Sequence, residues 1–350
     1  MNTNKYDAVF FISFGGPEKR EDVMPFLEIV TRGRGIPAGR LQEVAHHYDE
    51  MGGASPINAI TAAQAEALKK VLAERKMPYP VYIGQRNWHP FIEDTLRRMM
   101  VDGIKRAIGF VTAAHRCEAS LERYIKAVDE AREKIGPGAP EIDYVDPWFN
   151  HPLFIEAICQ RIQEEMTPSP SPLPKGRGPT SMSTSGTEPL AFSLQGEGGR
   201  RPDEGLPWVF TAHSIPTPMA EASRYVQELE TTARLVCQKL GRAQWTLAYT
   251  SRSGRPTDPW LEPDVCDVIR AQAEKGVRDI VLIPIGFVAD HVEVLYDLDV
   301  EAAQVARETG VKLHRAKTVG DHPVFIHMIA DVIQKRRAAQ ALRPETSALR

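Results

Sequence analysis

The sequence has no long hydrophobic run and few cysteines, and each absence excludes a class of protein. No stretch approaches the roughly 18 consecutive apolar residues that a membrane-spanning helix needs, so we expect no membrane span. The cysteines form no CxxC pair and no zinc or iron–sulfur spacing. We expect free thiols in a reducing compartment, and these are Cys117, Cys159, Cys237 and Cys266.

An excess of charge of one sign is also missing. The formal net charge is −3 over 350 residues, which gives no electrostatic reason to expect nucleic acid as a partner. The N-terminal residues, MNTNKYDAVFF, enter an apolar strand at once and lack the layout of a signal peptide. A hydrophobic content of 42% and a charged content of 25% are typical of a soluble globular protein. We therefore expect a cytoplasmic protein that is long enough for two domains.

The two halves of the chain follow one plan of four apolar segments separated by helical segments. The parallel segments are 9–17 with 208–216, 80–84 with 245–251, 106–115 with 278–291, and 142–154 with 312–325. Alternating strands and helices predict parallel sheets with helices on both faces. We expect an α/β fold of two similar Rossmann-like domains, each a four-stranded parallel sheet flanked by helices, with the active-site cleft between them.

The repeat also predicts the domain boundaries. The first domain covers residues 1–150, the second covers 151–335, and a tail of residues 336–350 is expected to be loose. Residues 167–207 are rich in proline, glycine and serine, a composition that cannot bury much apolar surface. We expect a disordered insert or a surface excursion there, because a position between two repeats tolerates insertion. Whether the insert has any role stays open.

The segment Ile280–Glu301 is expected to change from a buried strand into an acidic helix. Its first six residues are almost all apolar, which suits a strand covered on both faces. A helix is expected from Asp290, and a spacing of four places the carboxylates of Glu293, Asp297 and Glu301 on one helix face. Spacing alone leaves two interpretations open. Asp290 and Glu293 could form a capping box, or the carboxylates could serve a cation.

His213 lies where the fold predicts a ligand site. In open α/β sheets, ligands bind beyond the carboxyl ends of the strands, where the strand order reverses. His213 follows the first strand of the second half and Glu293 follows the third, so both should reach one crevice. An imidazole and a carboxylate suit a divalent ion such as Fe(II), and the imidazole can also accept protons. A backbone-bonded structural histidine is the alternative for His213. A structural or surface role is favoured for His89, His115, His291 and His322.

Several motifs together resemble the ferrochelatase family. Residues 210–216, FTAHSIP, and 284–299, PIGFVADHVEVLYDLD, are similar to its two signature segments. Further matching segments follow in family order at 13–18, 31–37, 52–57 and 259–263. The resemblance covers nearly the whole chain apart from the insert and is greatest to the bacterial coproporphyrin III type. It implies an enzyme, a lyase of haem biosynthesis, that inserts Fe(II) into coproporphyrin III and releases two protons.

The resemblance assigns the metal chemistry to the second half. It implies that His213 and Glu293 are the catalytic and metal-binding residues, which hold the iron and handle the protons. Asp297 and Glu301 would extend a polar track for metal or protons. Many relatives of the coproporphyrin type carry a tyrosine where this chain has Phe14, and phenylalanine cannot ligate iron. By the internal repeat, Phe14 should face His213 across the cleft, which leaves His213 and Glu293 as the main ligands.

The resemblance assigns porphyrin binding to the first half. Ser55 and Tyr124 match positions that contact the porphyrin in the family. Tyr48 and the loop with Arg32 and Arg34 would meet its propionates, because arginine forks suit carboxylates. The implied mechanism is ring distortion, in which a cleft that ruffles the flat porphyrin exposes its nitrogen lone pairs and approaches the transition state.

Fe(II) is expected to be a substrate, with no iron–sulfur cluster as a cofactor. Some family members hold a [2Fe–2S] cluster through clustered cysteines near the C-terminus, and this chain has no cysteine after Cys266. Three alternatives stay open: a protoporphyrin IX ferrochelatase, a chelatase for another metal or tetrapyrrole, and a non-catalytic tetrapyrrole or metal carrier. The sequence determines neither the iron donor nor the oligomeric state, and a monomer is compatible with it.

Overall fold

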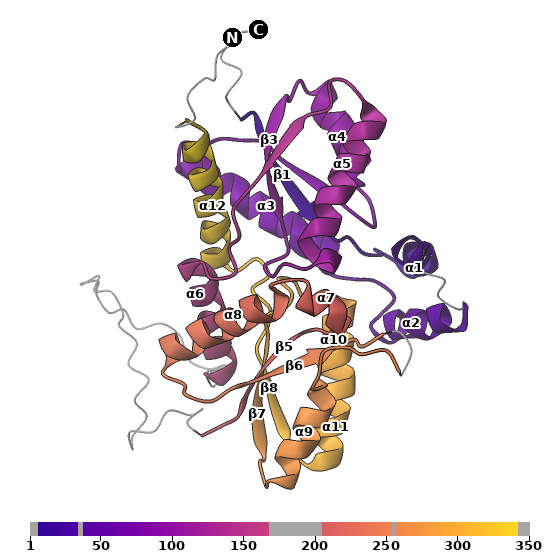
Figure 1. Ribbon diagram of the computed structural model, residues 1–350, viewed down its shortest axis with the longest axis vertical. Coiled ribbons are helices and arrows are strands. Elements are labelled where there is room, and N and C mark those ends of the chain that lie inside the picture. Colours follow the sequence, from indigo (N-terminus) through magenta and orange to yellow (C-terminus); the bar gives the residue numbers. More distant parts are fainter. Residues whose placement is uncertain (1–5, 34–37, 168–204, 254–256, 342–350) are drawn as a thin grey trace, which may run out of the picture.

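Two four-stranded parallel sheets form the centre of the molecule (Figure 1). The computed structural model describes residues 6–33, 38–167, 205–253 and 257–341. The first sheet has the order β2-β1-β3-β4, with β1 (Ala8–Ser13), β2 (Val81–Gln85), β3 (Arg106–Val111) and β4 (Glu141–Tyr144). The second has the order β6-β5-β7-β8, with β5 (Trp208–His213), β6 (Thr246–Thr250), β7 (Asp279–Pro284) and β8 (Lys312–Arg315). The predicted α/β fold with two similar units is confirmed.

The central strands are apolar because helices cover both faces of each sheet. Every residue of β1 is buried, as are the first five residues of β5 and the last five of β7. In both sheets the first and third strands of the unit are neighbours, and the chain leaves them in opposite directions along the sheet. Their carboxyl ends therefore form the predicted ligand-binding edge.

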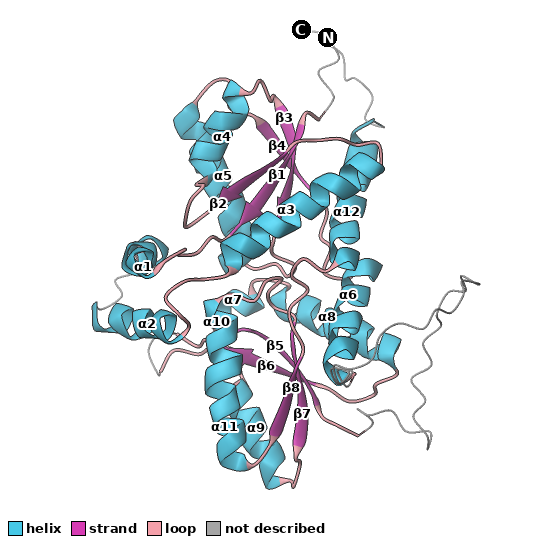
Figure 2. Ribbon diagram, turned by 180° about the vertical axis from the view of Figure 1, so that it is seen from behind, coloured by secondary structure: helices cyan, strands magenta, loops and turns pink. Residues whose placement is uncertain are grey.

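Helices α4 and α5 cover one face of the first sheet, and α3 and α12 cover the other (Figure 2). The helices of the N-terminal half are α1 (Val23–Thr31) after the short η1 (Arg20–Asp22), α2 (Ala38–Glu50), α3 (Ile57–Glu74), α4 (Ile92–Val101), η2 (Glu118–Glu122), α5 (Arg123–Ile135) and α6 (Pro152–Met166). Those of the C-terminal half are α7 (Thr217–Glu221), α8 (Tyr225–Leu240), α9 (Val265–Glu274), α10 (Val292–Leu295), η3 (Tyr296–Ala302), α11 (Ala303–Thr309) and α12 (Pro323–Ala341). Within the described ranges, no helix combines the length and the apolar character needed to cross a membrane.

The last helix of each half packs on the sheet of the other half. Helix α12 contacts α3 and β3 of the first unit, whereas α6 contacts α8 and β8 of the second (Figure 2). The two helices also pack against each other. Helix α12 continues through residues 336–341, so this part of the tail is helical rather than loose. Residues 342–350 and 168–204, which include most of the expected insert, lie outside the described residues.

Two histidines at equivalent points of the repeat fix this exchange of helices. The Nδ1 atom of His151 accepts the amide N–H two residues later at 3.3 Å and so caps α6, and His322 caps α12 in the same way at 3.3 Å. The Nε2 atom of His151 lies 4.0 Å from Asp331 in α12, and that of His322 lies 3.5 Å from Glu164 in α6. Each helix therefore begins at a histidine that faces a carboxylate of the other helix, which gives His322 the structural role expected for it.

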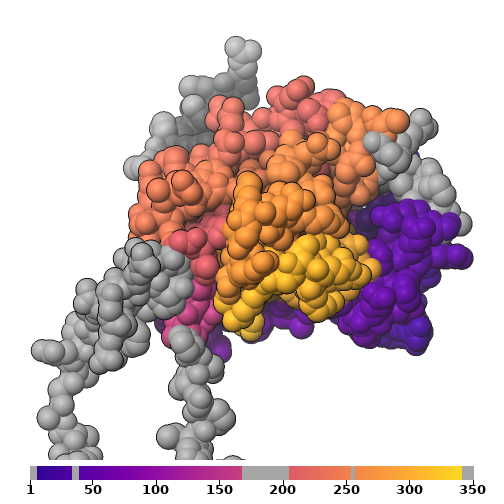
Figure 3. Space-filling model, turned by 90° about the horizontal axis from the view of Figure 1, so that it is seen from below, coloured from indigo at the N-terminus to yellow at the C-terminus, as the bar shows by residue number. Residues whose placement is uncertain are grey.

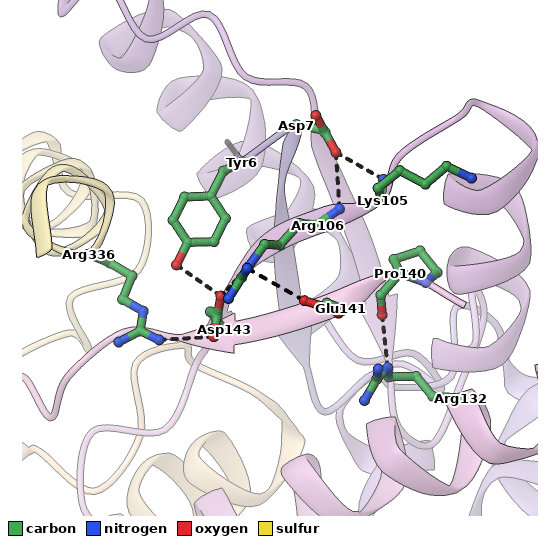
Figure 4. A network of polar contacts seen from close by, with 9 residues as sticks. All are labelled: Tyr6, Asp7, Lys105, Arg106, Arg132, Pro140, Glu141, Asp143 and Arg336. Carbon is green, nitrogen blue, oxygen red and sulfur yellow. Dashed lines mark hydrogen bonds and ion pairs between the residues drawn. The ribbon is translucent and has the colours of Figure 1, made fainter. Parts of the chain in front are cut away.

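The C-terminal part of α12 is held to the first sheet by a polar network around Asp143 (Figure 4). The Asp143 carboxylate accepts hydrogen bonds from the Tyr6 hydroxyl at 3.0 Å, from Arg106 Nε at 2.6 Å and from Arg336 Nη2 at 3.0 Å. Burial raises the pKa of Asp143, but these hydrogen bonds and the two arginine charges outweigh burial and hold the pKa below its usual value. The ionised carboxylate therefore joins β4, β3 and α12.

Candidate active site

His213 and Glu293 lie together at the carboxyl ends of β5 and β7. The Nε2 atom of His213 is 3.9 Å from Oε2 of Glu293. Their side chains are 30% and 43% exposed, respectively, so both are accessible from the solvent side. The topology brings the two residues to one crevice as predicted, because β5 and β7 are hydrogen-bonded neighbours.

The local backbone orients the His213 ring. Its Nδ1 atom contacts the carbonyl oxygen of Ser214, and a carbonyl can only accept a hydrogen bond. Nδ1 therefore carries the proton in the neutral ring, and the lone pair of Nε2 faces Glu293. The Tyr225 hydroxyl donates to the His213 carbonyl at 3.0 Å, and Phe287 packs edge-on with ring centroids 6.1 Å apart. These contacts fix the tautomer and the direction of the ring.

The helix that carries Glu293 begins later than predicted. Helix α10 starts at Val292, and the N-cap residue is His291, with no side-chain cap hydrogen bond. The prediction that Asp290 caps the helix is wrong. The Asp290 carboxylate instead pairs with Arg315 at 2.8 Å and accepts the Thr318 N–H at 3.3 Å. The charged arginine and the backbone of the β8 loop occupy this carboxylate, and the Glu293 carboxylate faces His213 rather than the Asp290 N–H.

The helix then widens into a π-helix over Tyr296–Ala302, where the spacing of the acidic residues predicted an α-helix. Asp297 is 9% exposed and accepts a hydrogen bond from the Ser251 hydroxyl. Burial is the main reason that the pKa of Asp297 rises to about 7. The Ser251 hydrogen bond lowers this pKa, and the negative charges of Glu293 and Glu301 raise it further. The three carboxylates are therefore electrostatically coupled along one track from Glu293.

Two tyrosines of the first unit lie close enough to Glu293 to be influenced by its charge. Burial raises the pKa of both Tyr48 and Tyr124, and the charge of Glu293 raises it further in each. The Arg86 guanidinium lies 5.8 Å from the centre of the Tyr124 ring and lowers the pKa of this phenol. Sequence reasoning did not single out Arg86, because a lone arginine after a strand carries no recognisable pattern.

Tyr48 and Phe14 belong to an apolar cluster at the edge of the site. The Tyr48 side chain is 5% exposed and packs with Phe26, at 6.0 Å between ring centroids, and with Val292 of α10. Phe14 is half-buried beside the same Phe26, at 6.2 Å. These residues bring α1 and α2 against the start of the helix that carries Glu293.

Ser55 is buried, whereas Arg32 is exposed. Ser55 is 8% exposed, and its hydroxyl lies 3.5 Å from the Ile57 N–H at the start of α3. Arg32 is exposed at the C-terminal end of α1. Arg34 lies outside the described residues.

The other histidines differ in their surroundings. His115 is buried, its Nε2 lies 3.0 Å from the Thr232 hydroxyl, and burial lowers its pKa to about 3, so it is a neutral structural residue. His291 is half-buried against Phe287, at 4.3 Å between ring centroids, and burial lowers its pKa. His89 is exposed.

The donor set at His213 and Glu293 is small. Within the part of the chain that the structure describes, no group of three or more histidine, cysteine, aspartate or glutamate side chains gathers to hold a metal ion. Resident structural and catalytic zinc sites use at least three protein ligands. One imidazole nitrogen and one carboxylate suit a divalent ion that passes through the site as a substrate.

The chain matches known proteins over nearly its whole length. A family profile described as Ferrochelatase matches residues 6–337. A ferrochelatase from Rhodopirellula baltica is 41% identical over 332 residues, which cover 95% of this chain and 86% of the relative. A coproporphyrin III ferrochelatase from Mycobacterium avium is 40% identical over 338 residues, with 96% and 89% covered.

A solved structure supports the fold independently. The SirB chain from Bacillus subtilis, determined with Fe3+, superposes with a TM-score of 0.52 at 10% sequence identity and covers 95% of this chain and 96% of SirB. At this identity the likeness shows the fold alone. The family profile and the relatives confirm the resemblance seen in the motifs. The chain therefore belongs to the ferrochelatase family and is an enzyme that inserts iron into a porphyrin in haem biosynthesis.

Proposed function

We propose that the porphyrin substrate is coproporphyrin III. The support comes from the motifs, which are most similar to the coproporphyrin type, and from relatives with that activity in Mycobacterium avium and Streptomyces coelicolor, which are 40% and 38% identical. Coproporphyrin III carries four propionates and protoporphyrin IX carries two, so the two compounds differ in charge and shape at the ring edge. The enzyme should discriminate between them by kcat/KM.

The substrate proposal is tested with purified protein and Fe(II) under anaerobic conditions. Loss of the free-porphyrin spectrum is followed with coproporphyrin III and with protoporphyrin IX at matched concentrations. We expect kcat/KM to be at least about 100-fold higher for coproporphyrin III, a ratio that differential contacts to charged groups can supply. Equal rates, or metallation of protoporphyrin IX alone, would contradict this choice of substrate.

We infer that His213 and Glu293 hold the incoming iron and receive the protons that leave the porphyrin. The carrying observation is the 3.9 Å approach of Nε2 of His213 to the Glu293 carboxylate. Insertion of Fe(II) replaces two pyrrole N–H protons, so two protons must leave for each metal ion. Nε2 of His213 can accept one of them, and the carboxylates from Glu293 to Asp297 offer a route outward. Tyr124, Tyr48, Ser55 and Arg32 are proposed to bind the porphyrin from the first unit.

Substitution of the pair tests this assignment. His213→Ala and Glu293→Gln are each expected to lower kcat by at least about 100-fold, the range typical of positioned acid–base groups. Matched controls are His46→Gln, whose side chain is 69% exposed on α2, and Glu308→Gln on the exposed side of α11. Wild-type rates for both site variants would remove His213 and Glu293 from the mechanism.

We also propose that the enzyme works without an iron–sulfur cluster. Within the described residues, which include all four cysteines, no group of three or more histidine, cysteine, aspartate or glutamate side chains gathers to hold a metal, whereas a cluster is held by four cysteine or histidine ligands. Protein purified without oxygen should contain no acid-labile sulfide, and all four cysteines should be replaceable by serine or alanine without loss of the specific activity of the folded enzyme. Stoichiometric labile sulfide would contradict this proposal.

A further inference from the structure

Arg315 connects two carboxylates that lie on either side of Glu293 in the sequence. Its side chain, at the end of β8, is only 12% exposed. Its Nη2 atom lies 2.8 Å from Asp290 Oδ1, and its Nε atom lies 3.1 Å from Asp299 Oδ1. Asp290 precedes Glu293 by three residues, and Asp299 follows Asp297 by two. One guanidinium therefore holds both ends of the segment that carries Glu293 and Asp297.

Arg315 is one of several contacts that fix the position of this segment. Val292, Val294 and Leu298 are buried, the Ser251 hydroxyl donates to Asp297, and His47 stacks on Tyr296. Helix α10 is one turn long and has no side-chain cap at its N-terminus, and π-helical geometry follows immediately. Short helices and π-turns are marginal without tertiary contacts. Two backbone N–H groups of the loop after β8 hold the residues before the helix: Thr318 N–H donates to the Asp290 carboxylate at 3.3 Å, and Gly320 N–H donates to the Val288 carbonyl at 2.9 Å. Both act before Glu293, and the Ser251 and His47 contacts act beyond it, whereas Arg315 reaches both sides.

Among the described residues, the Glu293 side chain takes part in no hydrogen-bond network. It is 43% exposed, and its ion-pair partner is His213 at 3.9 Å. The position of its carboxylate is therefore set by the backbone of α10. We propose that Arg315 is a positioning residue, which sets the location of Glu293 relative to His213 by holding Asp290 and Asp299. This inference rests on the proposed role of Glu293.

Arginine suits this task better than lysine. The planar guanidinium spreads its charge over a broad plane and can face two carboxylates at once, whereas an ammonium is a single point charge. Loss of the charge also leaves Asp290 and Asp299 close together without a cation, and their repulsion would separate the two ends of the segment. The expected result is a displacement of Glu293 and not merely a less stable protein.

The first test separates positioning from stability. Arg315→Met keeps most of the apolar stem and removes the charge. We expect kcat to fall about 10- to 100-fold, the loss typical of a displacement near 1 Å at a reacting group. KM for the porphyrin should stay within about 2-fold of the wild-type value, because the proposed porphyrin contacts lie in the first unit. Arg315→Lys should restore less than half of the decrease in log kcat that Arg315→Met causes.

Arg106→Met is the matched control. Arg106 also bridges two carboxylates at the edge of a sheet, with Nε 2.6 Å from Asp143 and Nη1 3.6 Å from Glu141 (Figure 4), but it belongs to β3 of the first sheet, whereas His213 ends β5 of the second. Its loss should lower the unfolding midpoint while kcat, measured at a temperature where the variant is folded, remains at the wild-type value. An equal fall in kcat for both variants would mean that Arg315 acts only through general stability, and would overturn the proposal.

The second test asks whether Arg315 acts through Glu293. In a Glu293→Gln background, Arg315→Met should lower kcat by less than about 2-fold, because two residues that act as one unit are not additive. If Glu293→Gln lowers kcat but Arg315→Met costs the same factor in both backgrounds, the positioning role is wrong and the proposed site survives. If Glu293→Gln leaves kcat unchanged, the proposed site fails, and the role of Arg315 fails with it.

Discussion

The imidazole of His47 stacks on the ring of Tyr296, with 3.7 Å between the ring centroids and 9° between the ring planes. His47 lies on α2 of the first unit, and Tyr296 begins the π-helix that follows Glu293. In the view from below, the indigo and purple surface of the N-terminal part lies against the orange and yellow surface of the C-terminal part (Figure 3). The stack therefore joins the two units beside the candidate site.

Removal of this stack should weaken the contact between the units. His47→Ala is expected to lower the free energy of unfolding by the loss of buried apolar area and by about 1 kcal/mol more, which is typical of a paired ring contact. His46→Ala is the matched control on the same helix, because its side chain is 69% exposed and pairs with Glu50 of its own helix, at 3.2 Å. Its effect should stay within about 0.5 kcal/mol. Urea unfolding at pH 8 measures both variants, and equal losses would contradict an inter-unit role for His47.

The sequence predicts the neighbourhood of the site but not its exact geometry. The buried apolar runs predict β5 and β7, and the topology of a parallel sheet then brings His213 and Glu293 to one edge. The π-helix escapes prediction, because a spacing of four between Glu293 and Asp297 fits an α-helix equally well. Asp290 resembles a helix cap in sequence, but Arg315, 25 residues further on, occupies its carboxylate. Such long-range pairs leave no local pattern.

The exchange of helices α6 and α12 between the two units is also not predictable from the sequence. The repeat predicts two units, and both sheets have the same strand order. It does not indicate that each unit covers the sheet of the other with its last helix. The two His-Pro pairs at 151–152 and 322–323 are visible in the sequence as a repeated motif. Their function as helix caps that face carboxylates of the opposite helix depends on tertiary packing.

Asp297 should make the stability of the enzyme depend on pH. Its pKa is about 7 in the folded protein against an ordinary value of 3.8. Between these values the folded state binds more protons than the unfolded state, so stability falls as the pH rises from 4 to 7. Asp297→Asn is therefore expected to raise the free energy of unfolding at pH 8, by at most about 4 kcal/mol, while it lowers kcat.

The pH profile distinguishes this effect from simple repacking. The stability gain of Asp297→Asn should shrink steadily between pH 7 and pH 4, because protonation neutralises the wild-type carboxyl over that range. Asp267→Asn serves as the control, since its side chain is 71% exposed on α9. This control should show no comparable gain at pH 8. A gain for Asp297→Asn that stays constant from pH 4 to pH 8 would be incompatible with the raised pKa.

The Asp143 network should be required for docking of α12. Asp143→Asn leaves Arg106 and Arg336 without the carboxylate that both of them contact, and their side chains are only 23% and 21% exposed. We expect the free energy of unfolding to fall by about 2–3 kcal/mol. This is at the lower end of the loss usual for a broken buried ion pair, because the site is partly solvated. Glu141→Gln should cost less than about 0.5 kcal/mol, since Glu141 is 65% exposed and 3.6 Å from Arg106. Similar losses for the two variants would contradict the central role of Asp143.

Gly286 allows the chain after β7 to approach the end of β5 closely, next to His213. A Cβ atom at this position would lie 2.7 Å from both Cα and Cβ of Ala212 and 3.3 Å from the His213 N atom. These neighbours are backbone or rigidly attached to it, so they cannot move aside cheaply. Gly286→Ala should therefore cost about 1–3 kcal/mol of unfolding free energy through overpacking. The displacement of His213 should also lower kcat by about 10- to 100-fold.

Gly39→Ala provides the comparison for this substitution. Gly39 lies in α2, and a Cβ atom there would meet nothing within 4 Å. Alanine should stabilise this helix by up to about 1 kcal/mol through its higher helix propensity and leave kcat unchanged. The decisive measurement is kcat at a temperature where both variants are fully folded. A wild-type kcat for Gly286→Ala under these conditions would show that the position of His213 tolerates the shift, and would weaken the case that the His213–Glu293 geometry controls the reaction.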